Sequence, residues 1–147
     1  MQTGETLNVL GEDVTLLAAG AETGGTMTAV EVLVPPGSGP PPHTHVASEL
    51  LYVLDGELEV ELDGGRQTVD AGQVAAVPGG AVHTYRNASI APARFLAVLH
   101  PAGHERFFAA IGTPIDAPAP DGPPDVERVM RIARRHGIEF AAVAQVE

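Results

Sequence analysis

Glycine and proline interrupt residues 26–99 at intervals of about 8–12 residues, and this spacing is the strongest constraint on the fold. The segments between these turns are short and rich in β-branched and aliphatic residues, so we expect strands rather than helices. The predicted strands span 26–34, 49–54, 57–62, 66–70, 73–77, 82–86 and 93–99. Many short strands at even spacing are typical of an all-β barrel or jelly roll. A chain of 147 residues is long enough for one such domain.

The segment 57–62 (ELEVEL) alternates between acidic and apolar residues. Because the side chains of a strand point to opposite faces in turn, its two leucines and its valine should face a core and its glutamates should face water. Asp55-Gly56 lies between this segment and the strand before it. An Asp-Gly pair favours a hairpin turn because glycine accepts a positive φ, so we predict a β-hairpin over 49–62.

The chain changes character after Pro101. Residues 104–111 (HERFFAAI) carry an apolar stripe at helical spacing, and residues 125–136 (DVERVMRIARRH) do the same. Asp125 is suited to an N-cap, and Gly137 is suited to the position after the end of the helix. We therefore predict two short α-helices in a C-terminal extension over about 104–137. This extension should pack against the barrel core, at about 26–99, or against a partner subunit.

Charge is distributed unevenly along the chain. The net charge is −11, lysine is absent, and all eight arginines lie in residues 66–147. This composition is unsuited to nucleic acid or to anionic membrane surfaces, so we expect neither as a partner. Residues 1–11 show no signal peptide, and no apolar run approaches the roughly 20 residues of a membrane span, so we expect a cytoplasmic protein. Cysteine is absent, which excludes disulfides and thiolate ligands.

Three histidines and one glutamate have a spacing that suits a metal ion. His43 and His45 are two residues apart and would project to the same side of a strand. Glu49 follows after a short gap, and His83 would arrive from a separate pair of strands. Three imidazoles and a carboxylate suit one divalent first-row transition metal ion, and Fe, Mn, Ni, Zn and Cu are all compatible with them. Such a shell is incomplete, so it would leave room for water or substrate.

These residues lie in two gapped patterns, Gly37-x5-His43-x-His45-x3-Glu49-x6-Gly56 and Gly72-x5-Pro78-x-Gly80-x2-His83-x3-Asn87. Together the patterns resemble the two-part signature of the cupin superfamily, in the right order and at the right separation. The resemblance covers about Thr26–Leu99. It implies a double-stranded β-helix, or jelly-roll barrel, with His43, His45, Glu49 and His83 as the ligands of one metal ion. It also implies turn roles for the glycines of the patterns and a structural role for Asn87.

The C-terminal extension is similar to the tail of small cupins described as quercetin-dioxygenase-like. This second likeness is carried mainly by Pro101, Gly103, Glu105 and Phe108. The chain departs from many relatives at Ser48, where they have an acidic residue before the glutamate of the motif.

Two residues are candidates for catalysis. Glu49 is either a fixed metal ligand or a general base that leaves the ion to accept an acidic substrate proton. Tyr85 shares strand parity with His83, so it would point inward. There it either donates a hydrogen bond to a bound oxyanion or simply lines the barrel wall.

We expect a mainly apolar cavity, which suits an aromatic or polyketide-like ligand better than a sugar or a phosphate. The residues expected to line it are Met27, Ala29, Leu51, Val53 and Val98. Three further histidines, His100, His104 and His136, match no ligand position, and we expect them to be ordinary residues.

Three classes of function fit these features. The first is a metal-dependent enzyme acting on a small organic molecule, with a dioxygenase (an oxidoreductase) similar to flavonol-cleaving cupins as its leading form. A cyclase or isomerase that uses the ion as a Lewis acid is its second form. The other classes are a small-molecule-binding cupin without turnover and a structural or storage barrel, which the complete ligand set disfavours. We also expect a homodimer, in which residues 5–18 could add a strand across a partner.

Overall fold

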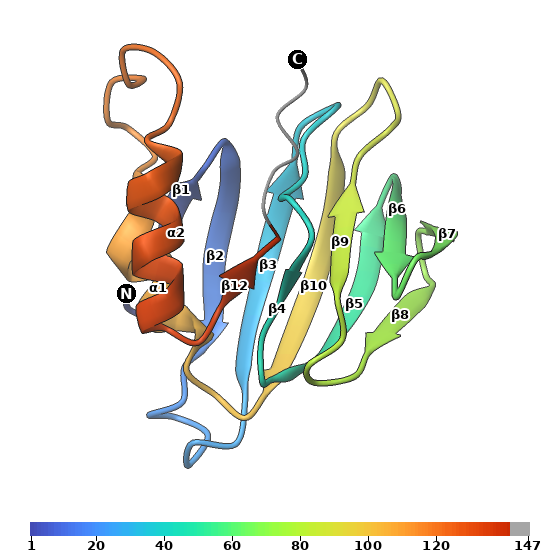
Figure 1. Ribbon diagram of the computed structural model, residues 1–147, viewed down its shortest axis with the longest axis horizontal. Helices are drawn as coiled ribbons and strands as arrows, with labels where there is room; N and C mark the ends of the chain where they lie inside the picture. The colour runs from blue at the N-terminus through green and yellow to red at the C-terminus, as the bar shows by residue number, and fades with distance from the viewer. Residues whose placement is uncertain (142–147) are drawn as a thin grey trace.

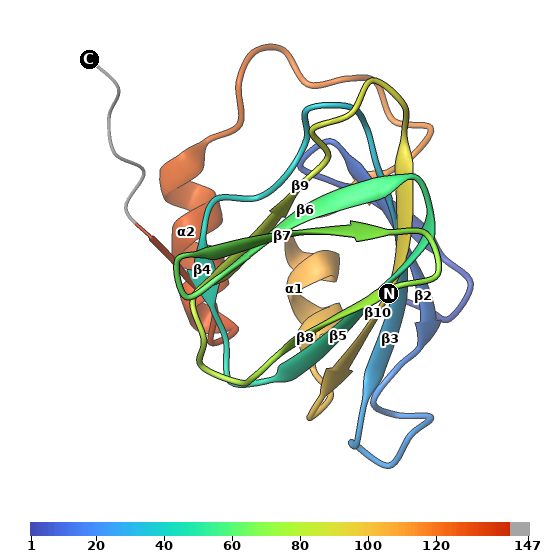
Figure 2. The same cartoon turned by 90° about the vertical axis from the view of Figure 1, so that its right-hand side faces the viewer.

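Two antiparallel sheets face each other and enclose the core of the molecule (Figures 1 and 2). The structure is a computed structural model, and it describes residues 1–141. The larger sheet has the strand order β11-β1-β2-β3-β10-β5-β8. Its strands are Thr113–Pro114 (β11), Thr6–Val9 (β1), Glu12–Ala18 (β2), Thr28–Val34 (β3), Ala93–His100 (β10), Ser48–Asp55 (β5) and Val74–Val77 (β8).

The smaller sheet has the strand order β12-β4-β9-β6-β7. Its strands are Glu139–Phe140 (β12), His43–Thr44 (β4), His83–Arg86 (β9), Glu57–Leu62 (β6) and Gly65–Asp70 (β7). Every strand pair in the two sheets is antiparallel. The predicted all-β jelly-roll architecture is confirmed, and each predicted strand is present with its ends within two residues of the prediction.

The N-terminal strands belong to the chain's own larger sheet. Residues 5–18, which we expected to reach a partner, contain β1 and β2, and β2 pairs with β3 of the same chain. The turn between them is tight because Leu10 and Gly11 both adopt a positive φ. This strand pair therefore covers the edge of β3 within the chain, and a homodimer stays a prediction.

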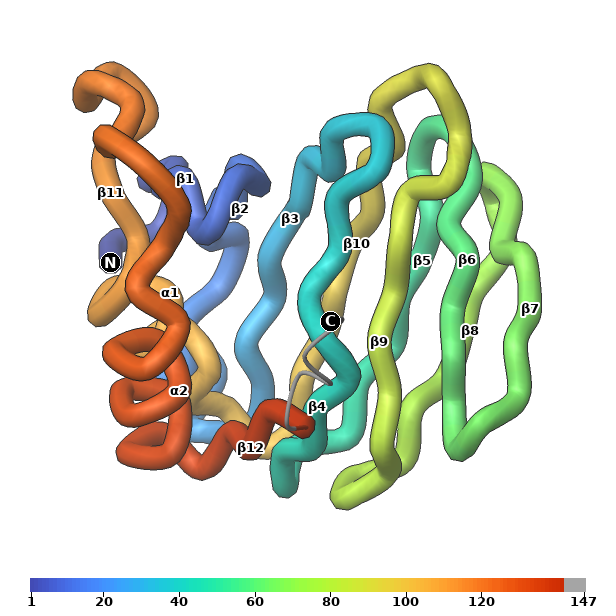
Figure 3. The backbone as a smooth tube through the Cα atoms, turned by 45° about the horizontal axis from the view of Figure 1, so that its top comes forward, coloured from blue at the N-terminus to red at the C-terminus, as the bar shows by residue number. Residues whose placement is uncertain are grey.

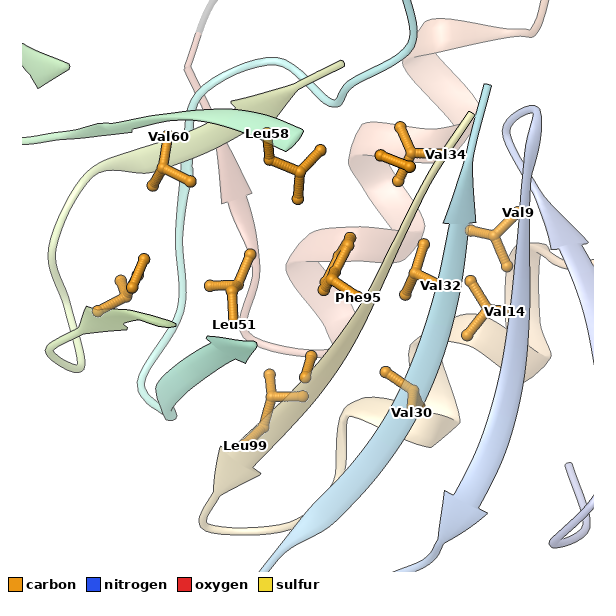
Figure 4. Packing of buried hydrophobic residues seen from close by; sticks show 14 of the residues in the cluster. Val9, Val14, Val30, Val32, Val34, Leu51, Leu58, Val60, Phe95 and Leu99 are labelled. Carbon is orange, nitrogen blue, oxygen red and sulfur yellow. The ribbon is translucent and has the colours of Figure 1, made fainter. Parts of the chain in front are cut away.

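The core lies between the two sheets and is almost entirely aliphatic (Figure 4). Leu58 and Val60 of β6 point across the interior toward Phe95 of β10 and Leu51 of β5. The predicted alternation of β6 is confirmed for these two residues, which are fully buried. Leu62, at the end of the strand, is only partly buried. Gly56 adopts the positive φ expected of the Asp-Gly turn. The predicted β-hairpin over 49–62 is wrong, however, because the turn carries the chain from one sheet to the other: β5 pairs with β8 and β10 in the larger sheet, and β6 pairs with β7 and β9 in the smaller sheet.

The two predicted helices are present, as α1 (His104–Ile111) and α2 (Val126–Arg135). Asp125 caps α2, because its side chain accepts a hydrogen bond from the backbone N–H of Arg128 at 3.1 Å. Gly137 follows the helix with a positive φ. The helices pack against each other, α1 also packs against β1 and α2 against β12 (Glu139–Phe140), so the extension covers the chain's own barrel. Neither of these described helices has the length and apolar character needed to cross a membrane.

The chain returns from α2 to the smaller sheet as β12 (Figure 3). Phe140 pairs with His43 and Glu139 pairs with Thr44. The backbone N–H of Ala141 also donates to the carbonyl of Pro42 at 2.8 Å. The C-terminal extension is thus attached directly to the strand that carries the first histidine of the motif.

Candidate metal centre

The four motif residues come from three strands and one loop that meet at one end of the barrel. The proline-rich loop 35–42 cannot continue a sheet because proline lacks an N–H, so β4 begins only at His43. His43 pairs in register with His83 of β9. Glu49 lies on β5, opposite Leu99 of the central strand β10.

The structure brings the donor atoms together. One ring nitrogen from each of His43, His45 and His83 lies within 4.8 Å of the other two, so these residues could hold a metal ion. The carboxylate Oε1 of Glu49 lies 3.3 Å from Nε2 of His45 and 4.0 Å from Nε2 of His83. The structure therefore places Glu49 beside two of the three histidines.

Backbone carbonyls orient the three imidazole rings. Nδ1 of His43 lies 3.0 Å from the carbonyl oxygen of Pro41, that of His45 lies 2.8 Å from Ala47, and that of His83 lies 2.9 Å from Ala81. A carbonyl only accepts, so each Nδ1 carries the proton and each Nε2 keeps its lone pair. Metal-binding histidines are commonly oriented in this way.

Two of these lone pairs are buried without a partner. Nε2 of His45 and Nε2 of His83 make no hydrogen bond to any residue that the structure describes. The lone pair of His45 instead faces the carboxylate of Glu49, so two acceptors meet at 3.3 Å. Such an arrangement is unfavourable unless a cation lies between the acceptors, and the residues present therefore fit a metal ion.

The protonation states also suit a metal ion. Burial, with a contribution from the neighbouring His83, lowers the pKa of His43 to about 4. Burial also lowers the pKa of His83. Burial alone would raise the pKa of Glu49, but the nearby imidazoles of His45, His104 and His83 hold it below its usual value. At neutral pH the site thus offers neutral imidazoles and one carboxylate, which are the forms that bind metal.

Residues 30–99 match the model of the cupin domain. A solved cupin domain of an XRE family transcriptional regulator from Enterobacter cloacae is 31% identical, with a TM-score of 0.53, and the match covers 60% of this chain and 95% of that one. The chain belongs to the cupin superfamily.

Two further proteins are similar to this chain. Quercetin 2,3-dioxygenase of Bacillus subtilis is 31% identical over 133 residues, which cover 90% of this chain and 38% of that enzyme. The chain therefore spans well under two thirds of the enzyme's length. A RmlC-like cupin from Shewanella frigidimarina has the same fold at 22% identity, with a TM-score of 0.63 over 70% of this chain and 88% of that one.

A further histidine lies beside the cupin motif. His104, the first residue of α1, has its ring 4.9 Å from that of His45 and 5.2 Å from that of Phe108. Burial lowers its pKa to about 4, and the neighbouring His45 contributes. We expected an ordinary residue here, and this expectation was wrong because α1 folds back over the barrel. His100, by contrast, is exposed, and His136 lies at the end of α2.

The four candidate ligands His43, His45, Glu49 and His83 are called the metal-ligand cluster below. An apolar cavity of about 280 Å³ adjoins this cluster. Its polar or charged side chains, among the described residues, are His43, His104, Glu49, Glu12 and Tyr85. The barrel contributes aliphatic residues and Phe95 to the wall. The C-terminal extension supplies Phe107, Phe108, Val129, Met130, Ile138 and Phe140. The extension is therefore part of the binding cavity.

The predicted cavity lining was wrong. Leu51 and Val53 are buried in the core but do not line the cavity. Met27 is 41% exposed, and Ala29 and Val98 pair with each other on the outer face of the sheet. The inward face of β3 begins at Thr28, whose buried hydroxyl donates to Oε1 of Glu105 at 2.8 Å. The cavity is consequently lined by the alternate set, Val30, Val32, Ala97 and Leu99.

Tyr85 points inward, as its strand parity predicted, and its ring packs edge-on against Phe95 at 4.9 Å between ring centroids. Its hydroxyl donates to the carboxylate of Glu12, the first residue of β2. Burial, together with the charge of Glu12, raises the pKa of Tyr85 well above its ordinary value. Glu12 was not predicted, because it belongs to no sequence motif.

Proposed function

We propose that this cupin is a metal-dependent dioxygenase of a small aromatic or polyketide-like molecule. The observation that carries the proposal is a cluster of three oriented imidazoles and one carboxylate at the end of an apolar cavity. Similarity to quercetin 2,3-dioxygenase over nine tenths of this chain supports the type of reaction. The proposal assigns the metal-ligand role to His43, His45, Glu49 and His83.

The cavity wall supports an aromatic substrate. Four phenylalanines contribute to it, and no lysine or arginine does so among the residues that the structure describes. A small polar acid would therefore meet no cationic side chain on the wall and would leave much of the cavity unfilled. A flat, largely apolar molecule would bury its rings against the phenylalanines and present its oxygens to the cluster.

The chain's own residues would bind, orient and deprotonate this substrate. A bound redox-active ion would supply the electron exchange between substrate and O₂ that dioxygenation requires. Glu49 is ionised and sits beside His45, so it could accept the proton of an enol or phenol that approaches the cluster. The apolar wall would exclude water during the reaction, and His104 would limit the space on the α1 side.

Oxygen uptake tests the proposal. Protein stripped of metal would be reloaded separately with Fe(II), Mn(II), Ni(II), Cu(II) or Zn(II) and offered a panel of flavonols and catechols. We expect O₂ consumption stoichiometric with ring-cleaved product for at least one redox-active ion, and loss of activity in His83→Ala. The exposed His100→Ala is the matched control and should keep its activity.

Two outcomes would contradict the proposal. Product formation without O₂ uptake would identify a cyclase or isomerase. Metal-dependent binding of panel members without any product would identify a small-molecule-binding module. One related cupin domain of known structure belongs to a transcriptional regulator, so the second outcome has a precedent in the superfamily.

A further inference from the structure

A second buried polar cluster lies in the cavity, away from the metal-ligand cluster. Glu12 is only 7% exposed. Its Oε1 accepts a hydrogen bond from the hydroxyl of Tyr85, and its Oε2 accepts one from the hydroxyl of Ser38 at 2.8 Å. These three residues come from β2, β9 and the proline-rich loop, and two of them, Glu12 and Tyr85, line the cavity.

The carboxylate of Glu12 retains unused capacity to accept hydrogen bonds. Two carboxylate oxygens can accept about four hydrogen bonds, and the described residues supply one to each oxygen. No arginine or lysine compensates its charge from the cavity wall, as far as the structure describes it. Burial accordingly raises the pKa of Glu12, although the two hydroxyls partly oppose this. Burying an apolar side chain at this position would cost less free energy than burying a carboxylate, so stability alone does not explain Glu12.

Strand registers show how far this cluster lies from the metal-ligand cluster. Glu49 pairs with Leu99 of β10. On the other side of the sheet, Val14 of β2 pairs with Val32 of β3. Val32 in turn pairs with Phe95 of β10, so Val14 lies at the level of Phe95. Leu99 and Phe95 are four residues apart, which is about 13 Å along a strand. Glu12 precedes Val14 by two residues and so lies at the end farther from Glu49.

Tyr85 is the member of the second cluster that lies near the metal-ligand cluster. It follows His83 by two residues on β9, so its backbone is about 7 Å from that of the ligand. The space between the two clusters is lined by apolar side chains such as Val30, Val32 and Phe95 (Figure 4). The cavity is therefore polar at two places, which lie at different levels along the strands, and it is apolar between them.

We propose that Glu12 is a substrate-recognition residue that accepts a hydrogen bond from a phenolic hydroxyl at the far end of an elongated, two-ended aromatic molecule. This inference rests on the proposed function, because the near end of the molecule is the one that meets the metal. Tyr85 and Ser38 hold the carboxylate in place at the cavity wall, and its remaining capacity to accept hydrogen bonds serves the bound molecule. The aromatic body of the molecule lies against the apolar wall between the two clusters.

Two matched probes test this assignment on the zinc-loaded protein, in which no turnover complicates binding. The first is 4-phenylcatechol, and the second is 4-(4-hydroxyphenyl)catechol, which adds one hydroxyl at the far end. Calorimetry should show that the added hydroxyl tightens Kd about tenfold in the wild type, as expected for a hydrogen bond to a buried carboxylate. In Glu12→Leu the two probes should bind with the same Kd.

Two further variants serve as a milder substitution and as a matched control. Glu12→Gln keeps the size of the side chain and one weaker acceptor, so its preference for the hydroxylated probe should fall below that of the wild type. It serves as the test if Glu12→Leu does not fold. Asp13→Asn neutralises the neighbouring carboxylate, which does not line the cavity, and should keep the full preference.

The outcomes separate this inference from the proposed function. If both probes need zinc for binding but the wild type shows no preference, or if the preference survives in both Glu12 variants, Glu12 is not the recognition residue. If the probes bind equally well to metal-free protein, or do not bind at all, the metal-chelating role of the near end is wrong and the inference is lost with it.

Discussion

Acid should destabilise the metal-free protein mainly through its buried histidines. The pKa values of His43 and His104 are lowered by burial to about 4 from an ordinary 6.5. Between these two values the unfolded chain binds more protons than the folded chain, so the free energy of unfolding must fall as the pH falls. For one such imidazole the loss between pH about 7.5 and about 5 is about 2 kcal/mol, and for two independent ones it is about 4 kcal/mol.

Replacing His104 isolates this effect. We expect His104→Leu, whose new side chain can pack on Phe107 and Phe108, to reduce the acid-induced loss by about 2 kcal/mol. Glu12 acts in the opposite sense: its pKa is raised above 4.5, so the stability it contributes at low pH is lost as the pH rises. Because Glu12 is present in both proteins, its contribution cancels in the comparison.

The assay is urea unfolding of chelator-treated protein, followed by circular dichroism at the two pH values. The exposed His100→Leu controls for the loss of one histidine and should keep the pH dependence of the wild type. If His104→Leu loses as much stability on acidification as the wild type does, His104 is not buried in neutral form and the reasoning is refuted.

Four further predictions concern the metal, the core and the assembly. Elemental analysis should show that His83→Ala no longer holds stoichiometric metal, because the variant lacks one of the three clustered imidazoles. Retention of the metal would contradict the proposed ligand set. Tyr85→Phe should lower the free energy of unfolding by about 1–3 kcal/mol, since buried Glu12 loses a donor, and an unchanged urea midpoint would argue against that bond. Phe95→Ala should cost about 3–5 kcal/mol in the same assay because Phe95 is 2% exposed, whereas Ile90→Ala, at a site that is 99% exposed, should change little. Light scattering should give the mass of a homodimer, and a monomer would contradict that expectation.

Local pattern was sufficient for much of the fold and of the candidate site. Alternation in 57–62 predicted the buried face of β6, and Asp125 predicted the start of α2. The turn at Asp55-Gly56 was predicted too, but the expected pairing of the strands on either side of it was wrong, because they belong to different sheets. His43, His45, Glu49 and His83 were found because their spacing and their residue types are themselves the signal. Such features depend on neighbouring residues along the chain, so they can be read without coordinates.

The other part of the site depends on contacts between distant segments. Thr28 and Glu105, which are 77 positions apart, are joined by a hydrogen bond that attaches the start of α1 to the start of β3. His104 reaches the cluster only because α1 folds over the barrel.

The sequence by itself determined that this chain is a cupin barrel with a candidate ligand set for a metal ion, because strand alternation, turn chemistry and motif spacing are local properties. Only the tertiary structure decided what surrounds these candidate ligands. Glu12 accepts a hydrogen bond from Tyr85, which is 73 positions away in the sequence, and the C-terminal extension forms one wall of the cavity. The physical reason is that burial, and with it the protonation and hydrogen bonding of a polar side chain, depends on which distant segments exclude water from it.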